Sequence, residues 1–364
     1  MSECRHDDLE DRPDAMATRL LVTRIRAEAQ ALGFQQLGIA TAPVAGTEAR
    51  LQRWLTLGWQ GAMHWMARHG RRRTRPAELV PGTRTILSVR MDYRSDHDHD
   101  AWETLADGRR AYIARYALGR DYHKLMRKRL QALATRIETI IGPFGYRVFV
   151  DSAPVMEKPL AQAAGLGWIG RNTLLLNRSA GSWFFLGELY TDLPLPADTP
   201  GQDHCGSCHA CLEICPTQAI VAPYRLDARR CIAYLTIEHP GSIPEDLRAP
   251  IGNRVFGCDD CQLVCPWNKF AALTREHAFS AVPDRSTGTL VDLFRWDEPR
   301  FLRETEGSAI RRLGHERWLR NLAVGLGNAP RSAAVLSALR ERLDHPSALV
   351  REHVRWALGR QGSD

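Results

Sequence analysis

Eight of the nine cysteines in this 364-residue chain fall between positions 205 and 265. The first four are spaced Cys205-x2-Cys208-x2-Cys211-x3-Cys215 and are followed by a proline, which is the iron–sulfur pattern of bacterial ferredoxins. A shorter run ends in the same Cys-Pro pair, and one cysteine separates the two runs; these are Cys258, Cys261, Cys265 and Cys231. A chain with this spacing is predicted to fold around two inorganic clusters and to transfer electrons.

The ligands can be divided between two cubane clusters. Each cluster needs four thiolates, and in two-cluster ferredoxins the fourth cysteine of a run ligates the other cluster. The second run lacks one leading cysteine, and Cys231 is the natural replacement. We therefore predict one [4Fe–4S] cluster on Cys205, Cys208, Cys211 and Cys265. The second is predicted on Cys215, Cys231, Cys258 and Cys261.

Other uses of these cysteines fit less well. Two structural zinc sites would also use Cys-x2-Cys pairs, but zinc motifs separate such pairs by a longer loop. Disulfides are disfavoured because nothing marks the chain as secreted. His204 and His209 lie beside the cysteines, and we interpret them as neighbours of the clusters or solvent-facing groups. Cys4 receives no role.

Composition and charge limit the setting of the protein. The length suggests two or three domains, and 44% hydrophobic and 25% charged residues are ordinary for a globular protein. Neither a membrane span of ~20 apolar residues nor a signal peptide is seen, and the thiols are predicted to be reduced, so we expect a cytoplasmic protein. The sequence does not determine the oligomeric state, for which we expect a monomer. The net charge is +7, and residues 311–364 hold ten arginines and five acids. Arginine-rich basicity favours a nucleic-acid partner, although codon bias in a GC-rich genome would give the same composition.

The chain divides into four regions. Residues 1–16 are predicted to be a disordered N-terminus, and residues 17–195 a mixed α/β (α+β) domain. In that domain an apolar 4-3-4-3 spacing from Met126 to Ile140 predicts a helix that Asp121 caps. A strand over 146–150 then delivers Asp151 at its carboxyl end, where ligands of α/β sheets usually bind.

The remaining regions are a ferredoxin-like domain over 196–275 and a helical region over 276–364. Apolar residues at helical spacing near the C-terminus resemble a HEAT-type repeat. Because so few repeats would not be stable alone, we expect this region to pack on the preceding domain.

One literal motif match is rejected. The segment GLGWIG over 165–170 matches the dinucleotide-binding fingerprint, which requires a strand before it and a helix after it. Here residues 157–164 look helical and residues 173–176 look like a strand, so the order is reversed.

Several segments together resemble the epoxyqueuosine reductase family. They are RYALGRDYHK at 115–124, VDSAP at 150–154, GLGWIGRN at 165–172, RCIAYLT at 230–236 and IGNR at 251–254, besides the cysteine pattern. The resemblance covers nearly the whole chain after residue 17. It implies an oxidoreductase that uses cobalamin and two [4Fe–4S] clusters to remove the epoxide oxygen of epoxyqueuosine at the wobble position of tRNA anticodons. This reaction completes queuosine biosynthesis, and its electron donor is not identified by the sequence.

The resemblance also implies roles for single residues. Asp151 would be the proton donor, which requires burial to raise its pKa enough to keep it protonated near neutrality. From the residues alone, Asp151 is as readily a turn or cap before Pro154. His123 would lie in the cobalamin pocket, although a first-turn helix residue contacting the backbone is the alternative. Further candidate cobalamin contacts, each with a structural alternative, are Arg73, Asp151, Asn172, Thr236 and Asp259.

The C-terminal arginines are the candidates for tRNA binding. Phosphate contacts would position the anticodon loop without reading its sequence, and we select Arg312, Arg317, Arg320 and Arg331. Two other functions stay open from the residues: reductive dehalogenation of a small molecule, and a non-enzymatic electron carrier or cofactor chaperone. The basic C-terminal region argues against the first, and the large α/β domain argues against the second.

Overall fold

The computed structural model describes residues 13–42, 44–95 and 100–362. Its central sheet has four strands in the order β1 (Gln36–Thr41), β2 (Thr85–Asp92), β7 (Phe184–Thr191) and β4 (Tyr146–Phe149). Every neighbouring pair is antiparallel. The domain is therefore α+β, and the rule for carboxyl ends of parallel strands does not explain the site, although β4 does lead directly into Asp151.

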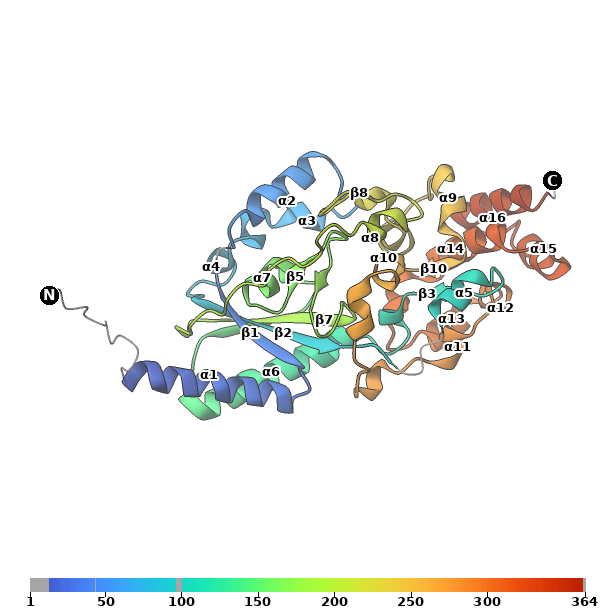
Figure 1. The fold of residues 1–364 in the computed structure, drawn as a ribbon. Coiled ribbons are helices and arrows are strands. Elements are labelled where there is room, and N and C mark those ends of the chain that lie inside the picture. Colours follow the sequence, from blue (N-terminus) through green and yellow to red (C-terminus); the bar gives the residue numbers. More distant parts are fainter. Residues whose placement is uncertain (1–12, 43, 96–99, 363–364) are drawn as a thin grey trace.

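Two long helices cover one face of this sheet. Figure 1 shows α1 (Pro13–Ala31) and α6 (Tyr122–Ile141) lying side by side below the strands. Buried apolar side chains of α6, among them Met126 and Leu130, lie in one hydrophobic core with alternate residues of β2, and the helix contacts β7. The side chain of Asp121 accepts a hydrogen bond from the His123 amide, so it caps α6 as predicted. Since α1 begins at Pro13, residues 13–16 are helical rather than disordered; Cys4 lies outside the described residues.

The opposite face of the sheet is partly polar. Ser88, Arg90 and Asp92 alternate with apolar residues along β2, and Glu188 of β7 is paired with Ser88. All four are buried, and helix α7 (Glu157–Ala163) packs over this face against β1, β2 and β7. Burying polar groups without hydrogen-bond partners costs free energy. This polar face of the sheet is therefore the candidate to meet a polar ligand.

The glycine-rich segment is a turn, as the sequence predicted. It follows α7 and leads into β5 (Trp168–Ile169), which pairs with β6 (Leu175–Leu176). Gly167 has a φ of +156°, and a Cβ there would lie 1.9 Å from the Leu176 carbonyl oxygen. Close backbone approach, not phosphate binding, explains this glycine.

Short elements connect these parts. They are α2 (Thr47–Thr56), α3 (Trp65–Arg68), η1 (Gly70–Arg73), α4 (Pro76–Leu79), α5 (Ala101–Ala106), β3 (Tyr112–Ile113) and η2 (Arg115–Ala117). The cysteine region adds α8 (Ala210–Glu213), β8 (Ile220–Ala222), β9 (Arg225–Leu226), η3 (Ala228–Arg230), η4 (Tyr234–Glu238), α9 (Glu245–Ile251), β10 (Arg254–Phe256), α10 (Asp260–Leu263) and η5 (Pro266–Phe270). Because β10 pairs with β3, the cysteine region is joined to the N-terminal part by a sheet.

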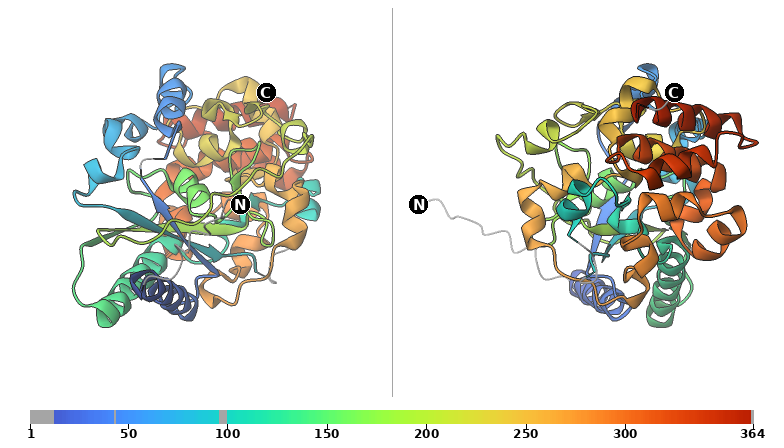
Figure 2. Two further views of the ribbon diagram at one scale, coloured as in Figure 1. Left: turned by 60° about the vertical axis from the view of Figure 1, so that its left-hand side comes forward. Right: turned by 90° about the vertical axis from the view of Figure 1, so that its right-hand side faces the viewer.

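The C-terminal region is helical and packs on what precedes it. Its elements are η6 (His277–Phe279), α11 (Pro283–Ser286), α12 (Leu290–Phe294), α13 (Glu298–Glu304), η7 (Ala309–Leu313), α14 (His315–Asn328), α15 (Ala333–Arg340) and α16 (Ala348–Arg360). One hydrophobic core contains residues of α12, α14 and α16 together with Ile113 and Phe256. This confirms that the region does not stand alone, and the right-hand view of Figure 2 shows its helices stacked at one end of the molecule. Within the described ranges, no helix is long and apolar enough to cross a bilayer.

Candidate active site

Asp151 occupies a strained turn directly after β4. Its φ of 43° is in the left-handed region, which Asp and Asn tolerate better than most residues but which still costs free energy. Its amide donates a 2.6 Å hydrogen bond to Glu157 Oε1 at the start of α7. The Asp151 side chain is 50% exposed, so its carboxylate is held in place and still accessible to a ligand.

A histidine links two carboxylates at this point. His123 Nδ1 lies 2.5 Å from Asp121 Oδ1, and His123 Nε2 lies 2.9 Å from Asp151 Oδ2. Burial opposes protonation of the imidazole, but the hydrogen bonds to both carboxylates outweigh it and raise the pKa of His123 to about 9. His123 is therefore an imidazolium at neutral pH.

The same contact corrects the expectation for Asp151. Burial raises the pKa of Asp151, but the hydrogen bond and charge of His123 prevail, and the pKa falls below its ordinary value of 3.8. Tyr122, which stacks on His123 at 4.2 Å and hydrogen-bonds to Asp151, acts in the same direction. Asp151 is ionised at neutrality, and the proton that the sequence assigned to it is held by its histidine partner.

A carboxylic acid with a raised pKa is nevertheless present at the start of α7, six residues after Asp151. Burial, followed by the charge of Asp151, raises the pKa of Glu157 to about 8. Burial also raises the pKa of Glu188, and both of its carboxylate oxygens lack a hydrogen-bond partner among the described residues. The sequence analysis missed both. Glu157 follows the VDSAP segment closely and could have been found there, whereas Glu188 resembles any strand residue.

Residues from distant segments complete the surroundings of Asp151. Tyr116 is buried, which raises the pKa of its hydroxyl. The pKa is further affected by the nearby charges of Asp151, Arg312, Glu238 and Asp259. Arg312 is thus the one predicted tRNA contact that the structure places among the electrostatic neighbours of Asp121 and Asp151.

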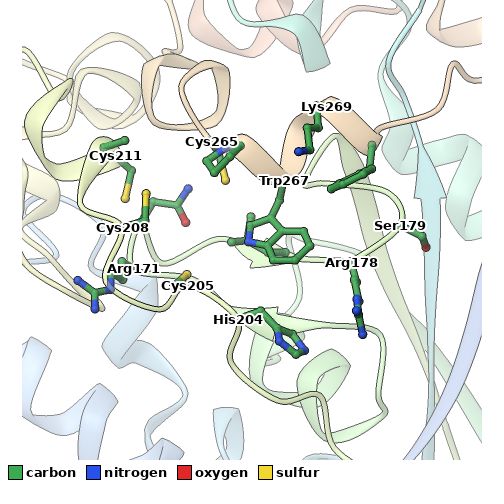
Figure 3. Close-up of a pocket in the computed structure, with 15 residues that line it drawn as sticks. Arg171, Arg178, Ser179, His204, Cys205, Cys208, Cys211, Cys265, Trp267 and Lys269 are labelled. Carbon is green, nitrogen blue, oxygen red and sulfur yellow. The ribbon is translucent and has the colours of Figure 1, made fainter.

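The first predicted cysteine set lines one cavity of about 930 Å³. Cys205, Cys208, Cys211 and Cys265 all face it, as Figure 3 shows. Burial, then the charges of the other three thiols, raises the pKa of Cys211 to about 11. Four such thiols form the donor set that a cubane requires.

The second set lies deeper. Burial raises the pKa of Cys261 well above its usual value, and the charges acting on it include those of Cys231 and Cys215. Burial likewise raises the pKa of Cys258, whose thiol donates to Asp260 Oδ2 at 2.7 Å. The charges that act on Lys158, in the first turn of α7, come from Glu157, Cys261, Cys231 and Asp151. This second set therefore lies on the Asp151 side of the first.

The predicted cobalamin contacts differ in what they can offer. Arg73 is buried, and its Nε has no partner among the described residues, while its Nη2 donates to the Trp65 carbonyl oxygen at 2.9 Å. Asn172 lines the cavity of the first cysteine set and donates to the Cys261 carbonyl oxygen at 3.3 Å.

The side chains of two other candidates already have hydrogen-bond partners within the protein. Thr236 Oγ1 donates to the Ile232 carbonyl and accepts from the Gly257 amide. Asp259 Oδ2 accepts from the Tyr112 hydroxyl and from the Arg115 amide, each at 2.8 Å. Their hydrogen bonds give these buried side chains structural roles.

The choice of Arg320 as a phosphate contact was wrong. Arg320 is 0% exposed and donates to the carbonyl oxygens of Leu235, His239 and Gly241. A guanidinium of this kind looks free in sequence because its backbone partners lie about eighty positions earlier in the chain.

Two more of these arginines have backbone partners. Arg317 is half-buried and donates to the carbonyl oxygens of Leu313 and Ile237. Arg331 is exposed but donates to the Gln361 carbonyl oxygen at the end of α16. Arg312 remains as the exposed candidate next to the Asp151 site.

Comparison with known proteins identifies the family. The model described as "Epoxyqueuosine reductase QueG, DUF1730" matches residues 73–152, and the model described as "4Fe-4S double cluster binding domain" matches residues 204–268. An epoxyqueuosine reductase of Xanthomonas campestris is 66% identical over 93% of this chain and 96% of the relative. The chain belongs to the epoxyqueuosine reductase family. The enzyme of that name from Escherichia coli is 53% identical over 94% of this chain and 89% of the relative.

Solved structures agree with this assignment. A crystal structure of epoxyqueuosine reductase with an epoxyqueuosine-modified tRNA-Tyr stem loop superimposes with a TM-score of 0.86 at 28% identity, covering 95% of this chain and 91% of that one. The selenomethionine-labelled enzyme gives the same TM-score and covers 94% and 91%. The similarity thus extends over nearly the whole chain. It includes a domain that binds two iron–sulfur clusters, which argues against the alternative of two zinc sites.

The burial of Arg320 leads to a stability prediction. Arg320→Ala should lower the free energy of unfolding by about 3–5 kcal/mol, because it leaves buried carbonyl groups without donors. Arg312→Ala, at an exposed position, should change it by less than about 0.5 kcal/mol. Thermal unfolding of both variants, followed by circular dichroism, tests this; equal melting temperatures would contradict a structural role for Arg320.

Proposed function

We propose that this protein reduces epoxyqueuosine to queuosine in the anticodon of tRNA, in the cytoplasm, as the last step of queuosine biosynthesis. The observation that carries this proposal is identity of 53–66% with epoxyqueuosine reductases over nearly the whole chain. The reaction removes one oxygen atom as water, so it consumes two electrons and two protons. Each part of that requirement has a matching group in the site.

The predicted cysteine sets would hold two [4Fe–4S] clusters, which would supply the electrons one at a time. One set comprises Cys205, Cys208, Cys211 and Cys265, which converge on one cavity. The other comprises Cys215, Cys231, Cys258 and Cys261. The charges of Cys231, Cys261 and Asp151 all act on Lys158. Lys158 therefore lies between the second cysteine set and Asp151.

Several residues near α7 would suit a bound cobalamin. Buried polar atoms without partners, namely Arg73 Nε and both carboxylate oxygens of Glu188, are the kind that the amide groups of a corrinoid would satisfy. When bound, cobalamin supplies a metal that accumulates two electrons. Arg73 would hold it through its unpartnered Nε. Both ring nitrogens of His123 are bonded to carboxylates, and Asn172, Thr236 and Asp259 also have partners within the protein, so these four would be supports.

The protein supplies the protons from two places. The His123 imidazolium, held by Asp121, is hydrogen-bonded to Asp151 and can pass a proton to the reaction through that carboxylate. The second proton comes from Glu157, whose Oε1 accepts the Asp151 amide. Asp151 is therefore the contact between the proton store and the substrate.

A basic groove beside this relay fits the anticodon backbone. A cavity of about 570 Å³ is lined by Arg120, Lys124, Arg311 and Arg312, together with Asp121. All four cationic residues are exposed, and the one lining carboxylate is already bound to His123. Because the wobble nucleoside has to leave its stack to react, phosphates on either side of it would lie next to the relay. The C-terminal helices, which we predict to be HEAT-like, would form one wall of this RNA site.

The three candidate functions differ in the substrate that the protein would convert. Anaerobic incubation of the reconstituted protein with an anticodon stem-loop containing epoxyqueuosine, followed by mass spectrometry of the nucleosides, should show loss of one oxygen atom. A reductive dehalogenase would act only on a halogenated aromatic compound, and an electron carrier would act on neither.

Replacing Asp151 tests the proton relay. Asp151→Asn should retain iron and stem-loop affinity but lose about two to four orders of magnitude in single-turnover rate, the usual contribution of general acid catalysis. Asn is the matched choice because it also tolerates a left-handed backbone. A rate within about threefold of wild type would remove Asp151 from the relay.

The pH profile tests where the protons are stored. His123, with a pKa of about 9, and Glu157, with a pKa of about 8, are protonated at neutral pH and lose their protons as pH rises. The wild-type rate should therefore fall above pH 8, and His123→Gln should both lower the rate and remove the part of the fall centred near 9. A profile of unchanged shape in His123→Gln would place the proton elsewhere.

Salt dependence tests the groove. The double variant Lys124→Ala, Arg312→Ala should weaken stem-loop binding. It should also reduce the slope of log K against the logarithm of salt concentration by about 0.7 for each phosphate that the variant no longer neutralises. Arg331→Ala is the matched control, because its guanidinium is engaged at the end of α16. Binding that is independent of salt in the wild type would contradict a phosphate groove.

A further inference from the structure

The two cysteine sets differ in their access to the outside. Of the eight thiols, Cys208 is exposed and the other seven are partly buried. The set with Cys208 is thus the outer one, and an external reductant would meet it first.

The surface around the outer set is cationic. The cavity on which its four cysteines converge is lined by Arg171, Arg178 and Lys269, and no carboxylate is among its lining residues. Arg178 and Lys269 are exposed, and Figure 3 shows them on either side of Trp267, across from Cys208. Asp203 lies beside this surface, but it accepts hydrogen bonds from the Tyr224 hydroxyl and the Cys205 amide.

Arg171 differs from the other two cations. Its guanidinium donates to the Gly206 carbonyl oxygen and contacts the ring nitrogens of His209 at 2.9 and 3.1 Å. It therefore holds the loop that carries Cys205 and Cys208. Arg178 and Lys269 have no such bond in the part of the chain that the structure describes, so their charges are available to a partner.

Exposed aromatic side chains accompany these charges. Phe270 is 47% exposed and lines the cavity, with Lys269 Nζ 4.8 Å from its ring centre. Tyr224 is 44% exposed, and its amide donates to the Arg171 carbonyl oxygen. Aromatic groups within a polar, cationic rim have the composition of a protein interface.

We propose that this surface, defined by Arg178, Lys269, Trp267, Phe270 and Tyr224 around Cys208, docks an acidic protein that delivers one electron at a time. In each encounter the reduced carrier loses one electron and the outer cluster gains it, so a turnover takes two encounters. Small interfaces steered by charge are typical of such transient electron-transfer complexes. The inference depends on the cluster ligands of the proposed function and is independent of the RNA substrate.

A flavodoxin reduced to its hydroquinone is a suitable probe, because it is acidic and gives one electron per encounter. Stopped-flow bleaching of the clusters should show a second-order rate constant that rises as salt is lowered. The double variant Arg178→Glu, Lys269→Glu should reduce this constant at least tenfold, the lower end of electrostatic steering. Reduction by dithionite, a small anion that needs no docking surface, should fall much less than reduction by flavodoxin.

Matched controls separate docking from folding and from the enzyme reaction. Arg127→Glu, Lys128→Glu reverses two exposed charges on α6 and should leave the flavodoxin rate within about twofold. If the double reversal loses iron, Arg178→Gln, Lys269→Gln replaces it with a smaller expected loss.

The result against the proposal is a flavodoxin rate that neither salt nor the double variant changes. Dithionite-driven conversion of the stem-loop reports the proposed function separately, so it can succeed while the docking surface fails.

Discussion

Two adjacent side chains of α14 hold together the segments that carry the deeper cysteines. Arg320 and Asn321 are both buried, and they donate hydrogen bonds to carbonyl oxygens of η4 and of β10, including those of Leu235, Thr236 and Val255. Cys231 precedes η4 and Cys258 follows β10, so the positions of both thiols depend on these bonds. The C-terminal helices therefore help to position the cysteines that we propose as cluster ligands.

A series of neighbouring residues links the deeper cysteines to Asp151 and His123. The deeper cysteines adjoin Lys158, Lys158 adjoins Glu157 and Asp151, and Asp151 meets His123 at the start of α6. The sheet contributes through its two different faces, one apolar and packed on α1 and α6, the other bearing Glu188 toward α7. The second cysteine set and the His123–Asp151 pair are thus linked through Lys158 and Glu157.

Local signals in the sequence predicted much of this arrangement. The cysteine spacing, the Asp121 cap of α6, the strand that leads into Asp151 and the reversed glycine turn all depend on a few neighbouring residues. The failures involve long-range contacts. Arg320 looks like a free surface cation until its partners in η4 are known, and the lowered pKa of Asp151 depends on His123, which lies 28 positions away. The antiparallel order of the sheet likewise depends on pairings between distant segments.

The left-handed turn at Asp151 restricts what can be learned by changing that residue. A φ of 43° is unfavourable for nearly every side chain with a Cβ, and least so for Asp and Asn. A longer acid or an alanine would move the loop and detach the Glu157 contact at the same time as it altered the carboxylate. Chemical and conformational effects at this position can be separated only within that narrow set of backbone-compatible side chains.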